Sequence, residues 1–137
     1  MKRSVLSLIA VLVFVLAAPA KTLTAQELRS HLLAALSLAS ETELFIGQIE
    51  EGRILQQFRM RHADYLRQEA RRQAQEMRES RSDSGDTRAP ARCAEQLELL
   101  IHELALISVP NHDETLPQAR QRVHAIREAL RAAEASL

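Results

Sequence analysis

Apolar side chains recur every three or four residues after residue 24, as one face of an α-helix requires. Thr24 is followed three residues later by Glu27, which is the pattern of a capping box at a helix start. Together these signals predict a helix over about 25–50. The apolar positions of this helix are Leu28, Leu32, Ala35, Leu36, Ala39, Ile46 and Ile49.

The apolar series changes direction at Gly52. In a continuous helix, Phe58, His62 and Tyr65 would lie roughly a third of a turn away from the first apolar face. Because glycine is common at helix ends, we expect a break here and a second helix over about 53–80, with these three residues on its apolar stripe. A helix continuous through Gly52 would instead be about 80 Å long and would favour a long, kinked first hairpin.

The second half of the chain predicts two further helices. Residues 81–88 lack large apolar side chains and contain Gly85, so they predict a loop. Residues 89–108 are apolar on almost every side, which is typical of the most enclosed helix of a domain. The final helix, over about 115–136, carries a heptad seam that can pack inside the domain or against a second chain. The seam consists of Leu116, Ala119, Val123, Ile126, Leu130, Ala133 and Leu137.

Four amphipathic segments of similar length, joined by short connections, predict an all-α fold. The expected architecture is an antiparallel, up-down-up-down bundle of about four helices that forms one domain over residues 21–137. Only 3 Gly and 4 Pro interrupt the chain, which agrees with helix nearly throughout.

The N-terminus has the order of a secretory signal peptide. Lys2 and Arg3 precede an apolar run over 5–18, and the small residues Ala18-Pro19-Ala20 follow it. The run of 14 residues is shorter than the roughly 20 that a membrane-spanning helix needs. We therefore expect residues 1–20 to be cleaved and the protein to be exported to a periplasmic or extracellular location; a retained anchor is the alternative.

Charge and aromatic content exclude one class of partner. Loss of the signal peptide would leave 16 basic against 18 acidic residues, a net charge of about −2, so the bulk charge does not favour a polyanion. Only Phe45, Phe58 and Tyr65 are aromatic after residue 20, and there is no Trp. Without a stacking platform, no nucleic acid partner is expected.

Four arginines form the most distinctive surface feature of the predicted second helix. Arg53, Arg67, Arg71 and Arg78 fall on the side opposite Phe58. Such a stripe can dock an acidic protein surface or an anionic envelope component. The alternative is an ordinary solvated helix face.

Cys93 is the only cysteine, so it has no partner within its own chain. Helical spacing places it on one face with Leu97, Ile101 and Leu104, which favours core packing, because free cysteine is among the most buried residue types. An intermolecular disulfide, and with it a homodimer, is the second interpretation. No nearby base in the sequence supports a reactive thiol.

Three histidines on three different predicted helices define the alternative function. In an antiparallel bundle His62, His102 and His124 would lie at similar heights, and three imidazoles can bind zinc or copper. Only His62 lies on an apolar stripe, however, and the Glu-x-x-His and H-E-x-x-H patterns are absent. Haem would have to bind noncovalently, because C-x-x-C-H is also absent. No cofactor is therefore expected, and a metal- or haem-binding bundle remains the alternative.

Enzyme motifs are lacking as well: the sequence has neither G-x-S-x-G nor a glycine-rich phosphate loop. The segment Leu23-Thr24-Ala25-Gln26-Glu27 resembles the Leu-Thr-x-x-Gln start of a family of small, exported, all-helical stress adaptors and chaperones. Here the Gln comes one place early and Glu27 takes its position. The resemblance implies an adaptor-like role, so we expect noncovalent binding to a protein or an envelope component.

Overall fold

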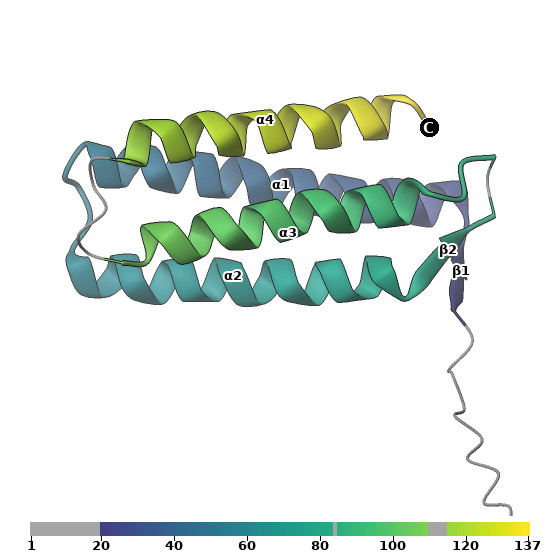
Figure 1. Ribbon diagram of the computed structural model, residues 1–137, viewed down its shortest axis with the longest axis horizontal. Helices are drawn as coiled ribbons and strands as arrows, with labels where there is room; N and C mark the ends of the chain where they lie inside the picture. The colour runs from purple at the N-terminus through teal and green to yellow at the C-terminus, as the bar shows by residue number, and fades with distance from the viewer. Residues whose placement is uncertain (1–19, 84, 110–114) are drawn as a thin grey trace, which may run out of the picture.

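The computed structural model describes residues 20–83, 85–109 and 115–137. These residues form four helices and one small parallel sheet (Figure 1). The fold is all-α in its architecture, as the apolar spacing predicts. The elements are β1 (Lys21–Leu23), α1 (Ala25–Glu50), α2 (Gln56–Arg78), β2 (Ser80–Ser82), α3 (Ala89–Ile107) and α4 (Leu116–Ala135).

The helices lie side by side along the long axis of the molecule, and each runs opposite to the one before it (Figure 1). α1 packs chiefly against α4, and α2 packs chiefly against α3. One continuous hydrophobic core, to which all four helices contribute, fills the centre. The heptad seam of α4 faces this core, since Leu116, Ala119, Val123, Ile126 and Leu130 are all buried. The seam therefore packs within the bundle.

The break at Gly52 is confirmed. α1 ends in a Schellman motif, in which the Gly52 N–H donates to the Ile49 carbonyl and the Arg53 N–H donates to the Gln48 carbonyl. Gly52 has φ of +68°, which glycine adopts without the strain that other residues suffer. The continuous helix and the long hairpin are thereby excluded. Because α2 begins only at Gln56, Arg53 lies in the turn and not on the helix.

The buried face of α2 differs from the predicted one. Phe58, His62 and Tyr65 lie along the edge of α2 that faces α1, and Phe58 and Tyr65 are more than half exposed. α2 instead buries a side that carries three alanines among larger residues, and it packs chiefly against α3. The buried positions are Arg59, Ala63, Leu66, Ala70, Gln73, Ala74 and Met77.

A two-stranded parallel sheet, absent from the prediction, closes one end of the bundle. Lys21 pairs with Ser80 and Leu23 pairs with Ser82. β2 therefore shortens the predicted loop over 81–88, and α2 ends at Arg78. The Leu23 side chain is fully buried and joins the core.

The start of α1 carries the predicted capping box. The Thr24 N–H donates to Glu27 Oε2 at 2.9 Å, and the Glu27 N–H donates to Thr24 Oγ1 at 3.2 Å. The backbone hydrogen bond from Thr24 also lowers the pKa of the Glu27 carboxyl.

Among the described residues, α1 is the one helix long and apolar enough to cross a membrane, judged by length and composition alone. Core helices of water-soluble proteins and signal sequences near an N-terminus share this property, so the finding is compatible with export. The predicted signal peptide itself lies outside the described residues, except for Ala20.

Candidate binding surface

Three rings on α2 form a stacked ladder on the surface. Phe58, His62 and Tyr65 are spaced four and three residues apart, which places them on one side of a helix. The ring centroids of Phe58 and His62 lie 5.3 Å apart with an interplanar angle of 12°, and those of His62 and Tyr65 lie 6.1 Å apart at 22°. The three rings therefore present one preorganised strip.

Residues of α1 contact the ladder on its inner side. The buried ring of Phe45 meets His62 edge-on, with a centroid distance of 4.7 Å and an angle of 73°. The Nε2 atom of His62 also lies 3.4 Å from Glu41 Oε1. The middle ring is thus fixed by two residues of α1, while Phe58 and Tyr65 remain 53% and 60% exposed.

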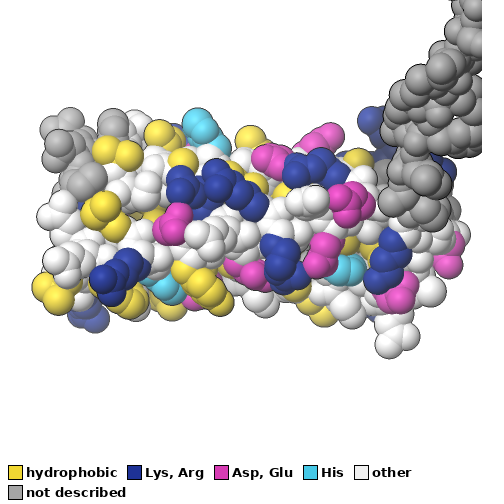
Figure 2. Space-filling view, turned by 90° about the horizontal axis from the view of Figure 1, so that it is seen from below, with side chains coloured by type: hydrophobic (Ala, Val, Ile, Leu, Met, Phe, Trp, Pro, Cys, Tyr) yellow, Lys and Arg dark blue, Asp and Glu magenta, His cyan; other side chains and the backbone are white. Residues whose placement is uncertain are grey.

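Aliphatic side chains extend the ladder toward the start of α2. Leu55 is 82% exposed, and it lines an open groove of about 410 Å³ together with Gln48, Arg53, Ile54 and Phe58. Figure 2, seen from the α2 side, shows hydrophobic side chains gathered over this end of the molecule. We refer to Ile54, Leu55, Phe58, His62 and Tyr65 as the aromatic face.

The predicted arginine stripe does not form as one helix face. Arg53 lies in the turn, 3.0 Å from Glu51; Arg67 contacts Asp64 at 2.8 Å; and Arg78 contacts Glu98 of α3. Arg71 is exposed and has no ion pair among the described residues. Three of the four charges are therefore already paired, which reduces the attraction for an anionic partner. That role for the stripe stays a prediction.

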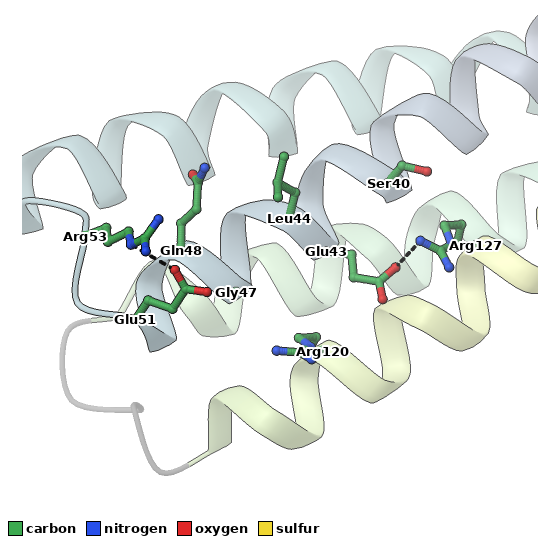
Figure 3. A pocket seen from close by; sticks show the side chains of 9 residues that line it. All are labelled: Ser40, Glu43, Leu44, Gly47, Gln48, Glu51, Arg53, Arg120 and Arg127. Carbon is green, nitrogen blue, oxygen red and sulfur yellow. Dashed lines mark ion pairs between the residues drawn. The ribbon is translucent and has the colours of Figure 1, made fainter.

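A second open groove, of about 470 Å³, runs between α1 and α4 (Figure 3). Its three arginines are each close to a carboxylate: Arg53 to Glu51 at 3.0 Å, Arg120 to Glu50 at 3.4 Å and Arg127 to Glu43 at 2.8 Å. Because every cation of this groove is paired, the groove has no evident site for an anion. Its other lining residues are Ser40, Leu44, Gly47 and Gln48.

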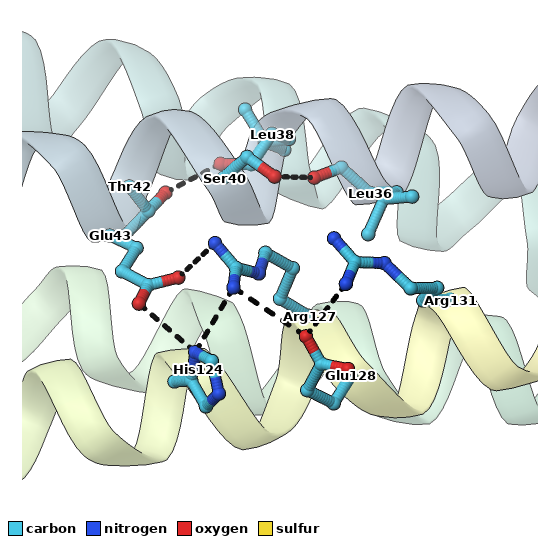
Figure 4. A network of polar contacts seen from close by, with 9 residues as sticks. All are labelled: Leu36, Leu38, Ser40, Thr42, Glu43, His124, Arg127, Glu128 and Arg131. Atoms are coloured by element: carbon cyan, nitrogen blue, oxygen red, sulfur yellow. Dashed lines mark hydrogen bonds and ion pairs between the residues drawn. The ribbon is translucent and has the colours of Figure 1, made fainter.

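A polar network continues from this groove along the seam of α1 and α4 (Figure 4). Glu43 Oε1 lies 3.1 Å from His124 Nδ1, and Arg127 Nη1 lies 2.8 Å from Glu43 Oε2. Arg127 Nη2 also lies 3.2 Å from His124 Nδ1. A single ring nitrogen cannot donate to the carboxylate and accept from the guanidinium at once. We assign the proton to Nδ1, because the charged carboxylate is the stronger acceptor.

The three histidines proposed as metal ligands are not brought together. His62 contacts Glu41, His124 contacts Glu43, and His102 is exposed on α3. Within the part of the chain that the structure describes, no group of three His, Cys, Asp or Glu side chains is placed to hold a metal ion. The described residues therefore provide no ligand set for zinc or copper, and the haem interpretation stays a prediction.

Cys93 is only 1% exposed and lines a small cavity of about 160 Å³ between α3 and α4. Burial raises the pKa of its thiol to about 12. A disulfide with another chain would require the start of α3 to move, so packing is the role that the position supports.

Two buried charged residues were missed by the sequence analysis. Arg59 donates its Nε–H to the Ile107 carbonyl at 2.8 Å, at the end of α3, and Glu103 of α3 pairs with Arg122 of α4. Both side chains make their polar contacts with groups inside the bundle, and neither belongs to a surface site. Neither has a local sequence signal, because their partners lie in other helices.

No protein-family model matches the chain, and no curated protein or solved structure shows significant similarity to it.

Proposed function

We propose that this protein is an exported helical adaptor that binds another protein noncovalently through the aromatic face. The observation that carries the proposal is the exposed ladder of Phe58, His62 and Tyr65. Large apolar side chains grouped on a surface are typical of interaction sites. Aromatic side chains in particular are enriched among the residues that dominate binding energy.

The geometry supports a protein partner better than a small ligand. Small-molecule sites enclose most of their ligand, whereas Leu55, Phe58 and Tyr65 lie on an open surface. The stacking restricts the rings before binding, so less side-chain entropy is lost when a partner covers them. These properties suit an apolar helix or strand of the partner laid along α2.

Charged residues around the aromatic face suggest which kind of residue borders the apolar contact on the partner. Arg61 is exposed near Phe58 and has no ion pair among the described residues, whereas the exposed Arg53 beside Leu55 is already paired with Glu51. We propose that the partner carries an apolar strip bordered by acidic residues. Rim charges of this kind affect the association rate and its salt dependence more than the final affinity.

Site-specific photocrosslinking tests the proposal. A benzophenone amino acid is placed at Tyr65, and in a separate control at Leu99, which is an exposed leucine of α3 at 53%. We expect a discrete adduct from position 65 that is absent from position 99, and mass spectrometry identifies the partner. The purified partner should then bind a Leu55→Ser/Tyr65→Ser variant at least tenfold more weakly than a Leu99→Ser variant.

Both variants replace exposed side chains, so both should fold. Equal adducts from positions 65 and 99, or equal binding of the two variants, would show that the aromatic face is not the contact surface.

A further inference from the structure

The outward side of α1 forms a second uncovered apolar surface, separate from the aromatic face. Leu33 and Leu44 are 45% and 65% exposed. They lie in one row with Ser37, Ser40 and Gly47, at alternating spacings of four and three residues. We refer to these five residues as the outer row of α1. Such spacing is the pattern of a helix–helix contact, but no described helix covers this row.

The composition of α1 indicates that something covers the row. The helix is apolar enough in composition to cross a membrane, yet well under half of its most apolar stretch is buried in the bundle. A helix of this apolar character is normally enclosed. The bundle itself therefore leaves part of the apolar surface of α1 without a partner.

The outer row has a cavity to receive a side chain. Gly47 faces open space, since a Cβ atom added there would meet no atom within 4 Å. Gly47 and Leu44 line the groove of about 470 Å³ between α1 and α4 (Figure 3). A leucine from an opposing helix would fit over the glycine and contact Leu44.

The charges at the two ends of the row are complementary to each other. Arg29 lies at the N-terminal end, 3.3 Å from Glu134 of α4, and Glu51 follows the C-terminal end, 3.0 Å from Arg53; both side chains remain at least half exposed and can be shared with a second partner. In an antiparallel pair of α1 helices centred on Ser40, Arg29 of one copy faces Glu51 of the other. Leu33 then faces Gly47, because these two residues are equally far from Ser40 along the chain. Every contact occurs twice, as in an isologous two-fold interface.

We propose that a second copy of this chain covers the outer row, with the two α1 helices antiparallel about a two-fold axis at Ser40. A lipid surface is the competing occupant of an apolar helix face. Surface-bound helices generally flank the apolar face with Lys and Arg, but α1 has no Lys or Arg after Arg29. The three arginines that line the groove beside the row are each paired with a carboxylate. The charge pattern therefore favours the second copy.

Other routes to a dimer are less accessible in this fold. Cys93 is buried, and the α4 seam is used inside the bundle. A dimer formed through the outer row is noncovalent, so it persists in reductant.

Sedimentation equilibrium measures the dimer directly. The protein is produced with its complete N-terminal segment, so that any processing takes place, and is examined from about 1 to 100 μM in reductant. We expect a monomer–dimer equilibrium. Leu44→Arg should weaken dimerisation at least 100-fold, because two arginines would be buried at the contact, whereas the matched Leu99→Arg variant of α3 should dimerise like the parent protein.

Charge reversal tests the register. Arg29→Glu and Glu51→Arg should each weaken dimerisation about fivefold, because each places like charges opposite one another twice. The double variant should recover most of the affinity, since it restores opposite charges.

Three outcomes would overturn the proposal: a monomer at all concentrations, a dimer that Leu44→Arg leaves intact, or single and double charge variants that are equally weak. Binding of a monomer to vesicles of phosphatidylglycerol and phosphatidylethanolamine, abolished by Leu44→Arg, would assign the outer row to lipid instead. None of these results depends on the aromatic face, so the proposed adaptor function is tested separately.

Discussion

The carboxylate of Glu103 on α3 accepts two hydrogen bonds from Arg122 on α4, from Nε at 2.5 Å and from Nη2 at 2.9 Å. Glu103 is 4% exposed, whereas Arg122 is partly in solvent. The pair also raises the pKa of the Arg122 guanidinium, through the hydrogen bonds to Glu103. An ion pair with one buried partner thus joins the last two helices.

Removing only the arginine should destabilise the bundle. Arg122→Ala would leave a buried carboxylate without its donor, which we expect to cost about 1 to 3 kcal/mol of unfolding free energy. Arg120→Ala, two residues away, removes only an exposed contact to Glu50 at 3.4 Å and should cost less than about 0.5 kcal/mol. Urea unfolding followed by circular dichroism measures both. Equal losses would mean that Glu103 is not buried as described.

Arg59 should be far more important for stability than its neighbour Arg61. The Arg59 side chain donates to the Ile107 carbonyl at 2.8 Å and reaches the Val109 carbonyl at 3.5 Å, at the end of α3 where backbone acceptors lack helical partners. We expect Arg59→Met to lower the unfolding free energy by about 1 to 3 kcal/mol. Arg61→Met changes an exposed side chain and should stay within about 0.5 kcal/mol. Similar midpoints for the two variants would contradict the capping role.

The two glycines of the first hairpin should respond to alanine in opposite directions. Gly52 has φ of +68°, so Gly52→Ala should cost about 1 kcal/mol through backbone strain. Gly47 lies inside α1 with open space at its Cβ position, so Gly47→Ala should add about 0.5 to 1 kcal/mol. Denaturant midpoints are compared at two protein concentrations to separate folding from association. A stabilising Gly52→Ala would show that α1 does not end in this turn.

The Cys93 thiol should be nearly unreactive in the folded protein. With a pKa of about 12, only about one thiol in 10⁴ is ionised at pH 8, against about a quarter in an unfolded chain. Iodoacetamide labelling, followed by intact mass, should therefore be about 10³-fold slower in buffer than in guanidinium chloride. Labelling rates within tenfold of each other would mean that the start of α3 opens readily and would revive the disulfide interpretation.

The raised pKa of the Cys93 thiol also predicts that the folded protein loses stability at alkaline pH. The folded-state pKa of Cys93 is raised above the unfolded value of about 8.5. The protonated thiol therefore favours the folded state fully below about pH 8.5, and this contribution falls as pH rises toward 12. A Cys93→Ala variant has no thiol to ionise, so its unfolding free energy should decline less steeply between pH 8 and pH 10. Parallel declines of parent and variant would argue against burial of the thiol.

The sequence alone determined the features that depend on residues close together in the chain. The apolar spacing located four helices, Thr24 and Glu27 located the start of α1, and Gly52 located its end. These signals succeed because helix periodicity, capping and positive φ are local properties. The up-down-up-down order follows from them, since short connections force neighbouring helices to be antiparallel.

Only the tertiary structure decided which face of each helix is covered. On α2 the buried side is the one that carries Ala63, Leu66 and Ala70, so Phe58 and Tyr65 form a surface ladder although their spacing predicted a core stripe. Arg59 would be expected in solvent, but a carbonyl at the end of α3 binds it inside the bundle. Burial depends on the shape and free hydrogen-bonding groups of the neighbouring helix, and those are not encoded in the periodicity of one segment.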